Sequence, residues 1–389
     1  MKNVNGRLLF TGDYHIYGEY GTFIKNKINH NVFCEKITEK LSKTDLNVFN
    51  LEDPITNNKR GIIKYGVHGV GSEDSLIPMK NVGFNLATFA TNHTYDMGNK
   101  GIQDTIDACK KYEIDIVGAG LTKKDAQKIY YKKIDNYNIA ILNFSRIEFN
   151  EVNDYHGGAN PLDVVDNVKD IKEAMKNADI VFVVVHEGVD VFHLPYPKLV
   201  KQMRFYADMG ADAIILHHSR IISGYEVYNN TPIFYGLGNL LHLTKNKDEH
   251  IGLMVKFTIG DKKQLDFELL PIELDPGKVQ VSLCEGEKKQ SIITKIDQLS
   301  DTIKSENKLR FEWENYVSQK KALYLSILSG YPIVFYRIAK NTGLLRLYEK
   351  FLLTNKKKYL AVWNIFRCQA HREAVNKNLS DIYNQISRK

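Results

Sequence analysis

The feature that most constrains the fold of this chain is a series of short polar clusters, each of which directly follows an apolar run. The runs are four to six residues long, rich in β-branched and aromatic side chains, as is typical of buried strands. The clusters are Gly12–His15, Asn50–Glu52, Thr91–His93, His186–Gly188 and His217–Arg220. Ligands of open α/β sheets bind beyond the carboxyl ends of the strands, so clusters that follow five strands can converge on one site.

The converging clusters contain carboxylates, amides and several imidazoles. Imidazole nitrogen is a borderline ligand, so this mixture suits Mn, Fe or Zn better than Ca or Mg alone. Asp96 follows His93 by three residues, and on one helical turn the carboxylate could orient the imidazole. The sequence therefore predicts a hydrolytic site centred on a divalent metal.

Each cluster also has a simpler interpretation when it is taken alone. Asp13 could cap a helix, Glu52 could neutralise a nearby cation, and Asn92 could occupy a turn. His186 and His218 could be core histidines that bond to backbone carbonyls. The shared position of all five clusters behind strands favours one site. Nucleophilic catalysis by Ser or Cys has little support, because the chain has no Gly-x-Ser-x-Gly motif and no Cys beside a His or Asn cluster.

The periodicity between the clusters predicts an α/β fold. Helical spacing occurs over 31–43, 101–112, 164–176 and 199–209, and a hairpin is expected from 130–134 and 138–143. The segments 14–30 and 53–75 are expected to be loops. Short strands follow at 225–228, 233–236, 251–259 and 265–271. An α/β half followed by a meander indicates two facing sheets flanked by helices.

Length and charge divide the chain of 389 residues into two expected parts, 1–280 and a basic helical region over 290–389. Residues 301–389 carry 17 Lys and Arg against 7 Asp and Glu, whereas the rest of the chain has a net charge of −3. Such a region can bind a membrane surface or a polymer synthase, although solvated lysines on helix faces are the simpler interpretation. We expect no nucleic-acid partner.

The uncharged stretch 322–336 lies within the basic region and contains Gly330 and Pro332. It could form two packed helices joined at a kink, or a surface that dips into a membrane interface or holds a partner. Four dispersed cysteines, an N-terminus that enters its first strand at once and the lack of an 18-residue apolar run predict a cytoplasmic location, with peripheral membrane association through this region.

Taken together, the motifs resemble the capsule synthesis protein CapA family, over about residues 7–274. The matching motifs are Gly12-Asp13, Asn50-Leu51-Glu52-x-Pro54, Asn92-His93-x-x-Asp96-x-Gly98, Val117-Gly118-Ala119-Gly120, Val185-His186-x-Gly188, His217-His218 and Pro232–Asn239. That family is linked to poly-γ-glutamate and other envelope polymers and looks like a branch of the calcineurin-like metallophosphatases. The resemblance implies a four-layer αββα sandwich, here with a C-terminal helical extension.

The resemblance also implies roles for individual residues around one or two divalent ions. Asp13 and His15 look like ligands of a first metal, Glu52 stands at the bridging position, and Asn92, His186 and His218 resemble the ligands of a second metal. His93, braced by Asp96, resembles the acid that meets the leaving group. Two positions depart from the pattern, because Arg220 replaces an expected ligand histidine and Glu187 replaces an aromatic residue.

The expected function is metal-dependent hydrolysis of a phosphoester or a related bond, in the synthesis of an anionic surface polymer. The substrate would be an anionic small molecule or polymer, and Arg220 could hold its phosphate or carboxylate in a bidentate grip. One alternative is a non-catalytic accessory subunit that binds polymer and has a degenerate metal site. Another is amide or peptide chemistry at the same metal, since the fold does not determine the substrate.

Overall fold

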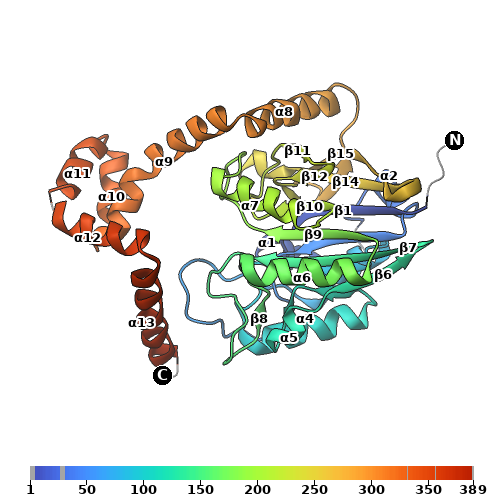
Figure 1. Cartoon of the computed structure of the whole chain (residues 1–389), viewed down its shortest axis with the longest axis horizontal. Coiled ribbons are helices and arrows are strands. Elements are labelled where there is room, and N and C mark those ends of the chain that lie inside the picture. The colour runs from blue at the N-terminus through green and yellow to red at the C-terminus, as the bar shows by residue number, and fades with distance from the viewer. Residues whose placement is uncertain (1–4, 27–30, 331, 355, 388–389) are drawn as a thin grey trace. The chain divides into compact units, whose positions relative to one another are not determined.

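A computed structural model of the chain describes residues 5–26, 31–330, 332–354 and 356–387. These residues form two compact units, Met1–Leu309 and Arg310–Lys389. The first unit contains two large β-sheets with helices (Figure 1), and the second unit is helical.

The first sheet has the strand order β16-β15-β14-β1-β2-β3-β4, and β13 also pairs with β1. Strands β1 to β4 are parallel, whereas β14, β15 and β16 form an antiparallel meander that joins them through β1. The strands are β1 (Arg7–Tyr14), β2 (Leu46–Leu51), β3 (Leu86–Thr88), β4 (Asp115–Val117), β13 (Asn239–Leu241), β14 (Ile251–Ile259), β15 (Leu265–Asp275) and β16 (Gln280–Leu283).

The second sheet has the order β11-β12-β10-β9-β7-β6. Its central strands β7, β9, β10 and β12 are parallel, and the expected hairpin is confirmed as β6 and β7. The strands are β6 (Tyr130–Ile134), β7 (Tyr137–Ser145), β9 (Ile180–His186), β10 (Ala213–His217), β11 (Tyr225–Tyr228) and β12 (Thr231–Phe234). A separate two-stranded ribbon consists of β5 (Ala119–Gly120) and β8 (Gly158–Ala159).

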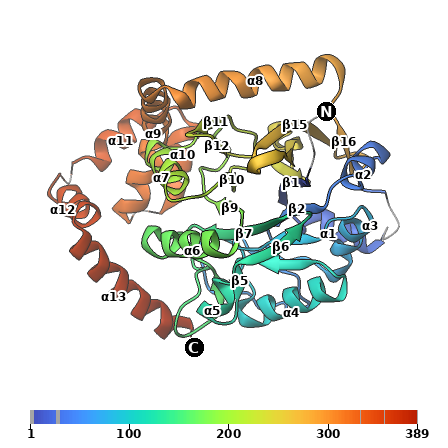
Figure 2. The ribbon, with the colours of Figure 1, turned by 45° about the vertical axis from the view of Figure 1, so that its right-hand side comes forward.

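The two sheets pack face to face through one apolar core. Phe10 of β1 stacks on Phe182 of β9 with 5.2 Å between ring centroids. The outer face of the first sheet buries apolar residues against α1 (Glu19–Asn26), α2 (Glu35–Leu41), α3 (Leu76–Asn81) and α4 (Gly98–Lys111). The outer face of the second sheet does so against α6 (Val164–Asn177) and α7 (Pro197–Asp208). Figure 2 shows these layers, which confirm the expected αββα sandwich.

One element of this layer was expected to be irregular. The segment 14–30 contains α1, which buries Tyr20 and Ile24, four residues apart, against the first sheet. The Tyr20 hydroxyl lies 2.7 Å from that of Tyr14. Because α1 is only eight residues long and includes Gly21, its helical period is too short to stand out in the sequence. Residues 27–30 of the expected loop lie outside the described part of the chain.

The first unit extends past the boundary expected near residues 280–290, because helix α8 (Gly286–Lys304) belongs to it. Ile292 and Ile296 of α8 are buried with residues of both sheets. The Ser300 hydroxyl also accepts a hydrogen bond of 2.9 Å from the backbone N–H of Tyr225. The helical character that begins near residue 290 therefore starts within the sandwich unit.

The second unit is built from α10 (Ile333–Asn341), α11 (Leu345–Leu352), α12 (Lys356–Arg367), α13 (Gln369–Ser387) and most of α9 (Glu306–Ser329). The chain leaves α9 at Gly330, which has a φ of +76°, and α10 begins after Pro332, so the expected helix break is confirmed. Among the helices of the described residues, none combines the length and the apolar character needed to cross a membrane.

Candidate metal centre

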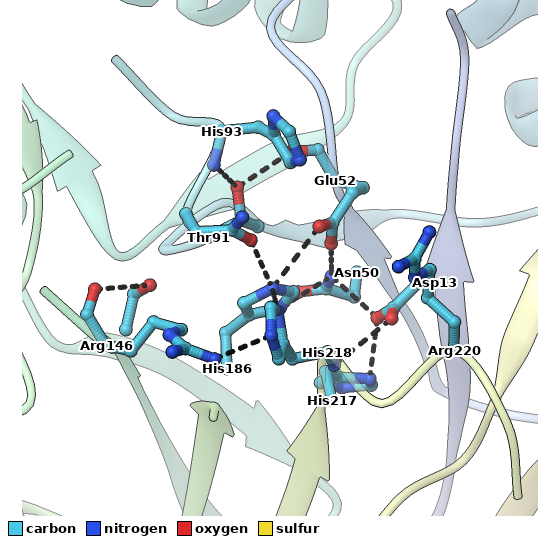
Figure 3. Close-up of polar contacts among 12 residues, drawn as sticks. Asp13, Asn50, Glu52, Thr91, His93, Arg146, His186, His217, His218 and Arg220 are labelled. Carbon is cyan, nitrogen blue, oxygen red and sulfur yellow. Dashed lines mark hydrogen bonds and ion pairs between the residues drawn. The ribbon is translucent and has the colours of Figure 1, made fainter. Parts of the chain in front are cut away.

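The polar clusters of the sequence meet where the carboxyl ends of strands from both sheets come together (Figure 3). Asp13 lies near the end of β1 and pairs with Asn50 of β2 across the first sheet. His186 ends β9, and His217 of β10 is its neighbour in the second sheet. Glu52 follows β2, and all of these side chains are buried. The site therefore depends on the packing of one sheet against the other.

A close approach of two backbone segments positions Asp13. The pairing of β1 shifts register between Phe10 and Asp13, and the N–H of Asp13 donates to the carbonyl of Gly238 at 3.0 Å. A Cβ atom on Gly12 would lie 1.9 Å from that same carbonyl oxygen. Gly12 therefore has to be glycine for the bulge to turn the Asp13 carboxylate into the site.

Two groups of three side chains have ligand atoms close enough to surround an ion. One group is Asp13, His15 and Glu52, and the other is Glu52, His186 and His218; within each group the ligand atoms lie within 4.8 Å of one another. Glu52 belongs to both groups. This arrangement places a carboxylate between two candidate ion positions, and every member is buried.

The second group converges on Nε2 of His186. This nitrogen lies 3.3 Å from Oε1 of Glu52, 3.2 Å from Nδ1 of His218 and 3.0 Å from Oδ1 of Asn92. A single ring nitrogen cannot form good hydrogen bonds with three such neighbours at once. The donor set of two imidazoles, a carboxylate and an amide oxygen matches the ligands that Mn, Fe and Zn accept.

The first group contains a histidine whose polar atoms are unusual for a buried side chain. Neither ring nitrogen of His15 has a hydrogen-bond partner among the described residues, and its nearest carboxylate, Asp53, is 3.7 Å away. Burial alone would lower the pKa of His15, but Asp53, Glu52 and Asp13 outweigh burial and raise it. Buried unpartnered nitrogen is costly, and a cation at this position would give it a partner.

Asp13 is the anionic centre of this group. Burial would raise its pKa, but His217, His186 and His15 lower the pKa of Asp13 to about 2. His217 Nδ1 lies 3.3 Å from the carboxylate, without the geometry of a hydrogen bond, and the backbone N–H of His218 donates to the other oxygen at 3.1 Å. The carboxylate is therefore ionised over the whole neutral range and suited to bind a cation.

Asn50 links the two groups, a role that its place in the Asn50–Glu52 cluster did not predict. Its amide nitrogen donates to Asp13 at 3.0 Å and to Glu52 at 3.1 Å. Asn50 lies in β2 and Glu52 directly follows that strand, two residues further on, so extended backbone places their side chains on the same side. That alternation was a usable signal in the sequence. By holding both carboxylates, Asn50 fixes the spacing of the two candidate ion positions.

His93 and Asp96 form the expected pair. His93 Nδ1 lies 2.6 Å from Asp96 Oδ2, and that oxygen also accepts from the N–H of Gly69 at 2.7 Å. Lys64 bonds the other oxygen of Asp96. Burial alone would lower the pKa of His93, but Asp96, Asp53 and Glu52 raise it. The ring is thus held by Nδ1, and Nε2 is the nitrogen that can exchange a proton with a ligand.

Arg220 lies at the rim of the site and pairs with acidic neighbours. Its guanidinium is 2.9 Å from Asp190 and 4.0 Å from Glu249, and their charges raise its pKa although burial opposes them. Arg220 and His218 both have positive φ, 61° and 90°, which is uncommon for residues other than glycine and is concentrated at functional sites. The turn after β10 is therefore held in a strained conformation.

Three further residues lie at the site; His242 and Arg146 were not predicted, and His217 was expected only as a member of its cluster. His242 packs on His15 with 4.3 Å between ring centroids and lies 3.1 Å from Glu249. His217 contacts Asp13, and Arg146 donates to Nε2 of His218 at 2.7 Å. His242 and Arg146 follow strands β13 and β7, so the rule that selected the clusters could have found them. Single polar residues after a strand are weak signals, however.

Fold and side chains together define the class of this protein: an αββα sandwich with a candidate two-ion centre at the joint carboxyl edge of its sheets. The chain belongs to the bacterial capsule synthesis protein family PGA_cap, whose family model matches residues 7–243. The matched region contains every residue of the candidate centre named above except Glu249, and it ends before α8 and the second unit.

Two curated relatives are similar over most of the sandwich. The chain is 28% identical to the PGA biosynthesis protein CapA of Bacillus subtilis (strain 168), over 69% of this chain and 75% of that protein. It is 27% identical to the capsule biosynthesis protein CapA of Bacillus anthracis, over 67% of this chain and 66% of that protein.

Solved structures of lower similarity also align. A putative 5'-nucleotidase from Staphylococcus aureus matches with 13% identity and a TM-score of 0.41, over 75% of this chain and 58% of its own. A 5'-nucleotidase from Candida albicans SC5314 matches with 13% identity and a TM-score of 0.41, over 77% and 58%.

Proposed function

We propose that this protein is a metal-dependent hydrolase that acts on a phosphoester or a related bond during synthesis of an anionic surface polymer. The observation that carries the proposal is the pair of ligand groups that share Glu52. Membership of a capsule synthesis family supports the cellular role. The family resemblance and the similarity to a PGA biosynthesis protein lead us to propose poly-γ-glutamate as the polymer.

The chain offers a complete set of donors for at least one ion and a partial set for another. His186, His218, Asn92 and Glu52 would hold one divalent ion, and Asp13, His15 and Glu52 would hold the other. Bound ions would supply Lewis acidity toward the scissile group and lower the pKa of a coordinated water to about 7. Because Arg220 replaces a ligand histidine, we expect the ion at Asp13 and His15 to be the more weakly held.

His93 would give a proton to the leaving oxygen. Asp96 holds Nδ1 of the imidazole and leaves Nε2 for this transfer, and the raised pKa of His93 keeps the ring protonated to higher pH. General acid catalysis of this kind contributes roughly a hundredfold to ten-thousandfold in rate. Asp96, itself bonded to Gly69 and Lys64, would fix the ring in position.

The charges around the centre favour an anionic substrate. Arg146 and Arg220 are partly buried, with about a quarter of each side chain exposed at the rim (25% and 27%). Guanidinium groups bind phosphate and carboxylate oxygens in a bidentate manner. The buried carboxylates alone would repel such a substrate, so these arginines, together with bound cations, would reverse the local charge.

The test is to purify the protein without chelator, measure bound metals by elemental analysis, and assay a panel of phosphoesters and γ-glutamyl amides after loading with Mn²⁺. We expect turnover that Glu52→Gln abolishes together with metal content. Glu226→Gln is the control, because Glu226 is a buried carboxylate that pairs with Arg204 outside the centre. A protein that takes up no divalent metal under any loading condition would refute the hydrolase proposal.

One alternative is a non-catalytic subunit that binds polymer at this centre. Arg220 and the bond from Arg146 to His218 favour it, since both place a positive charge next to candidate ligands. This alternative predicts polymer binding without turnover in the fully metal-loaded protein. The same panel, combined with a polymer-binding measurement, separates the two functions.

We further propose that the second unit binds a membrane surface with anionic lipids. Its large exposed side chains include Phe335 (50% exposed), Ile338 (53%) and Leu347 (62%), and residues of α10 and α11 line an open apolar groove of about 470 Å³. Residues 310–389 carry 15 Lys and Arg against 5 Asp and Glu. Apolar side chains among basic ones suit an anionic lipid surface.

A further inference from the structure

The bond between Arg146 and His218 determines which ring nitrogen of His218 carries the proton. Arg146 Nη1 lies 2.7 Å from Nε2 of His218. A guanidinium is always a donor, so Nε2 must accept. An imidazole whose Nε2 accepts a hydrogen bond carries a single ring proton, so the ring is neutral and that proton is on Nδ1.

This tautomer does not fit a metal ligand. The nitrogen of His218 that faces the second ion position is Nδ1, which lies 3.2 Å from Nε2 of His186. A coordinating imidazole nitrogen must offer a lone pair, but here Nδ1 holds the proton and points it at His186. An ion at this position requires the proton of His218 to move to Nε2. The new Nε2–H group would then face the guanidinium of Arg146, and two hydrogen-bond donors would repel each other.

We propose that Arg146 and a divalent cation compete for His218, so that filling the second ion position releases Arg146 from the imidazole. The inference rests on the metal centre proposed above and adds a positioning residue that the ligand set does not contain. In the released state, Nε2–H of His218 needs an acceptor and the guanidinium of Arg146 needs a new anion.

The structure provides an acceptor for Nε2–H. Asp190 Oδ1 lies 3.6 Å from Nε2 of His218, and the other oxygen of Asp190 is held by Arg220 at 2.9 Å. A small movement would bring Asp190 to hydrogen-bond distance. Arg220 thus has a role that requires no contact with the ion, since it holds the carboxylate that would stabilise the metal-binding tautomer of His218.

Arg146 also has alternative partners. It lies 2.9 Å from Glu148, 3.1 Å from the carbonyl of Gly188 and 3.7 Å from Glu187, so loss of the bond to His218 leaves it at the rim of the site. There it can bind an anionic group of a substrate. Metal and anion then favour each other, because each stabilises the released state.

The first test compares Mn²⁺ affinity of wild type and Arg146→Met by calorimetry. Met keeps the apolar stem but removes the donor. We expect the affinity of the ion bound by His218 to rise roughly tenfold to a hundredfold, the range for loss of a competing charge-assisted bond. Arg220→Met is the control, because it removes an equal charge but leaves the Arg146 bond in place; it should raise affinity far less or lower it.

An equal gain in both variants would reduce the effect to general charge repulsion and overturn the proposal, as would unchanged affinity in Arg146→Met. Inorganic phosphate should increase Mn²⁺ affinity in wild type and do so much less in Arg146→Met. If neither protein binds Mn²⁺, the metal centre itself is refuted. If wild type and Arg146→Met bind Mn²⁺ with equal affinity, the metal centre is supported and only the proposed role of Arg146 is refuted.

The second test needs no variant. Nitrogen NMR of histidine-labelled wild type distinguishes the two imidazole tautomers of His218. We expect the Nδ1–H tautomer without metal and the Nε2–H tautomer after addition of Zn²⁺, which is diamagnetic. A spectrum in which the Nε2–H tautomer is already present without metal would contradict the competition, whatever the affinities are.

Discussion

At the scale of single residues, the candidate centre depends on side chains whose surroundings would be unfavourable without a bound cation. His15 is buried and neither of its ring nitrogens has a hydrogen-bond partner in the described part of the chain, and His186 Nε2 is surrounded by three polar atoms that it cannot satisfy together. Both conditions cost free energy in an ordinary core. The shared residue Glu52 connects them, so single substitutions should differ in how many ions they affect.

We predict that His15→Gln lowers the affinity for one ion, His186→Gln lowers it for the other, and Glu52→Gln lowers both. Loss of a direct ligand should cost at least roughly a hundredfold in affinity, above the effect of losing an outer partner. Metal titration followed by elemental analysis measures this. His193→Gln is the control, because His193 bonds to the carbonyl of Ile222 away from the centre. Equal loss of both ions in His15→Gln and His186→Gln would contradict two separate positions.

At the scale of elements, the strands and long helices were predictable from the sequence. Short elements and single site residues, which lie outside any strong hydrophobic periodicity, were not. The apolar runs that precede Asp13 and His186 form β1 and β9. They were predictable because an uninterrupted apolar run of this length has few alternatives to a buried strand. Helix α1 was missed because its apolar face consists of few residues. His242 and Arg146 were missed because each is a single polar residue after a strand and not part of a polar cluster.

Helix α6 gives a prediction that concerns stability and pH. Asp170 is half-buried, with one oxygen that has no hydrogen-bond partner among the described residues. Burial and the charge of Asp166 raise its pKa to about 6. The folded state therefore binds this proton more tightly than the unfolded state, so the contribution of Asp170 to stability falls as pH rises from about 4 to about 6.

Asp170→Asn should accordingly stabilise the protein at pH 8, by about 1 kcal/mol after allowance for solvent screening, and leave stability nearly unchanged at pH 4. Thermal or urea unfolding at the two values checks this. Glu173→Gln, on the same helix, is the control, because Lys176 and Asn177 lower the pKa of Glu173; it should give no gain at pH 8. A gain from Asp170→Asn that is the same at both pH values would exclude the ionisation argument.

At the scale of the whole molecule, the charge asymmetry seen in the sequence follows the division into two units. The basic residues and exposed apolar side chains of the second unit lie outside the region that the family model matches. Composition predicted this separation but not its position, because the buried residues Ile292 and Ile296 of α8 belong to the sandwich although the helical region expected from the sequence begins at residue 290.

We predict that the full-length protein binds vesicles containing phosphatidylglycerol more tightly than vesicles of phosphatidylcholine alone, with an effect that fades at high salt. Phe335→Ser combined with Leu347→Ser should weaken binding at least roughly tenfold, since each removes an apolar contact. Val227→Ser is the control, because Val227 is an exposed apolar residue of the first unit (56%). Sedimentation with vesicles measures this, and equal binding by all three proteins would contradict a lipid-binding surface.

The distribution of the centre over both sheets has a consequence for the order of events during synthesis. Asp13 and Glu52 leave the ribosome long before His186 and His218, and β1 obtains its antiparallel neighbour only when β14 (Ile251–Ile259) has been made. A nascent chain that ends before residue 251 therefore holds the ligand residues but lacks β14, β15 and β16, the strands that complete the first sheet. Ion uptake must be among the last steps of maturation, and a cation present earlier would meet only scattered, mismatched ligands.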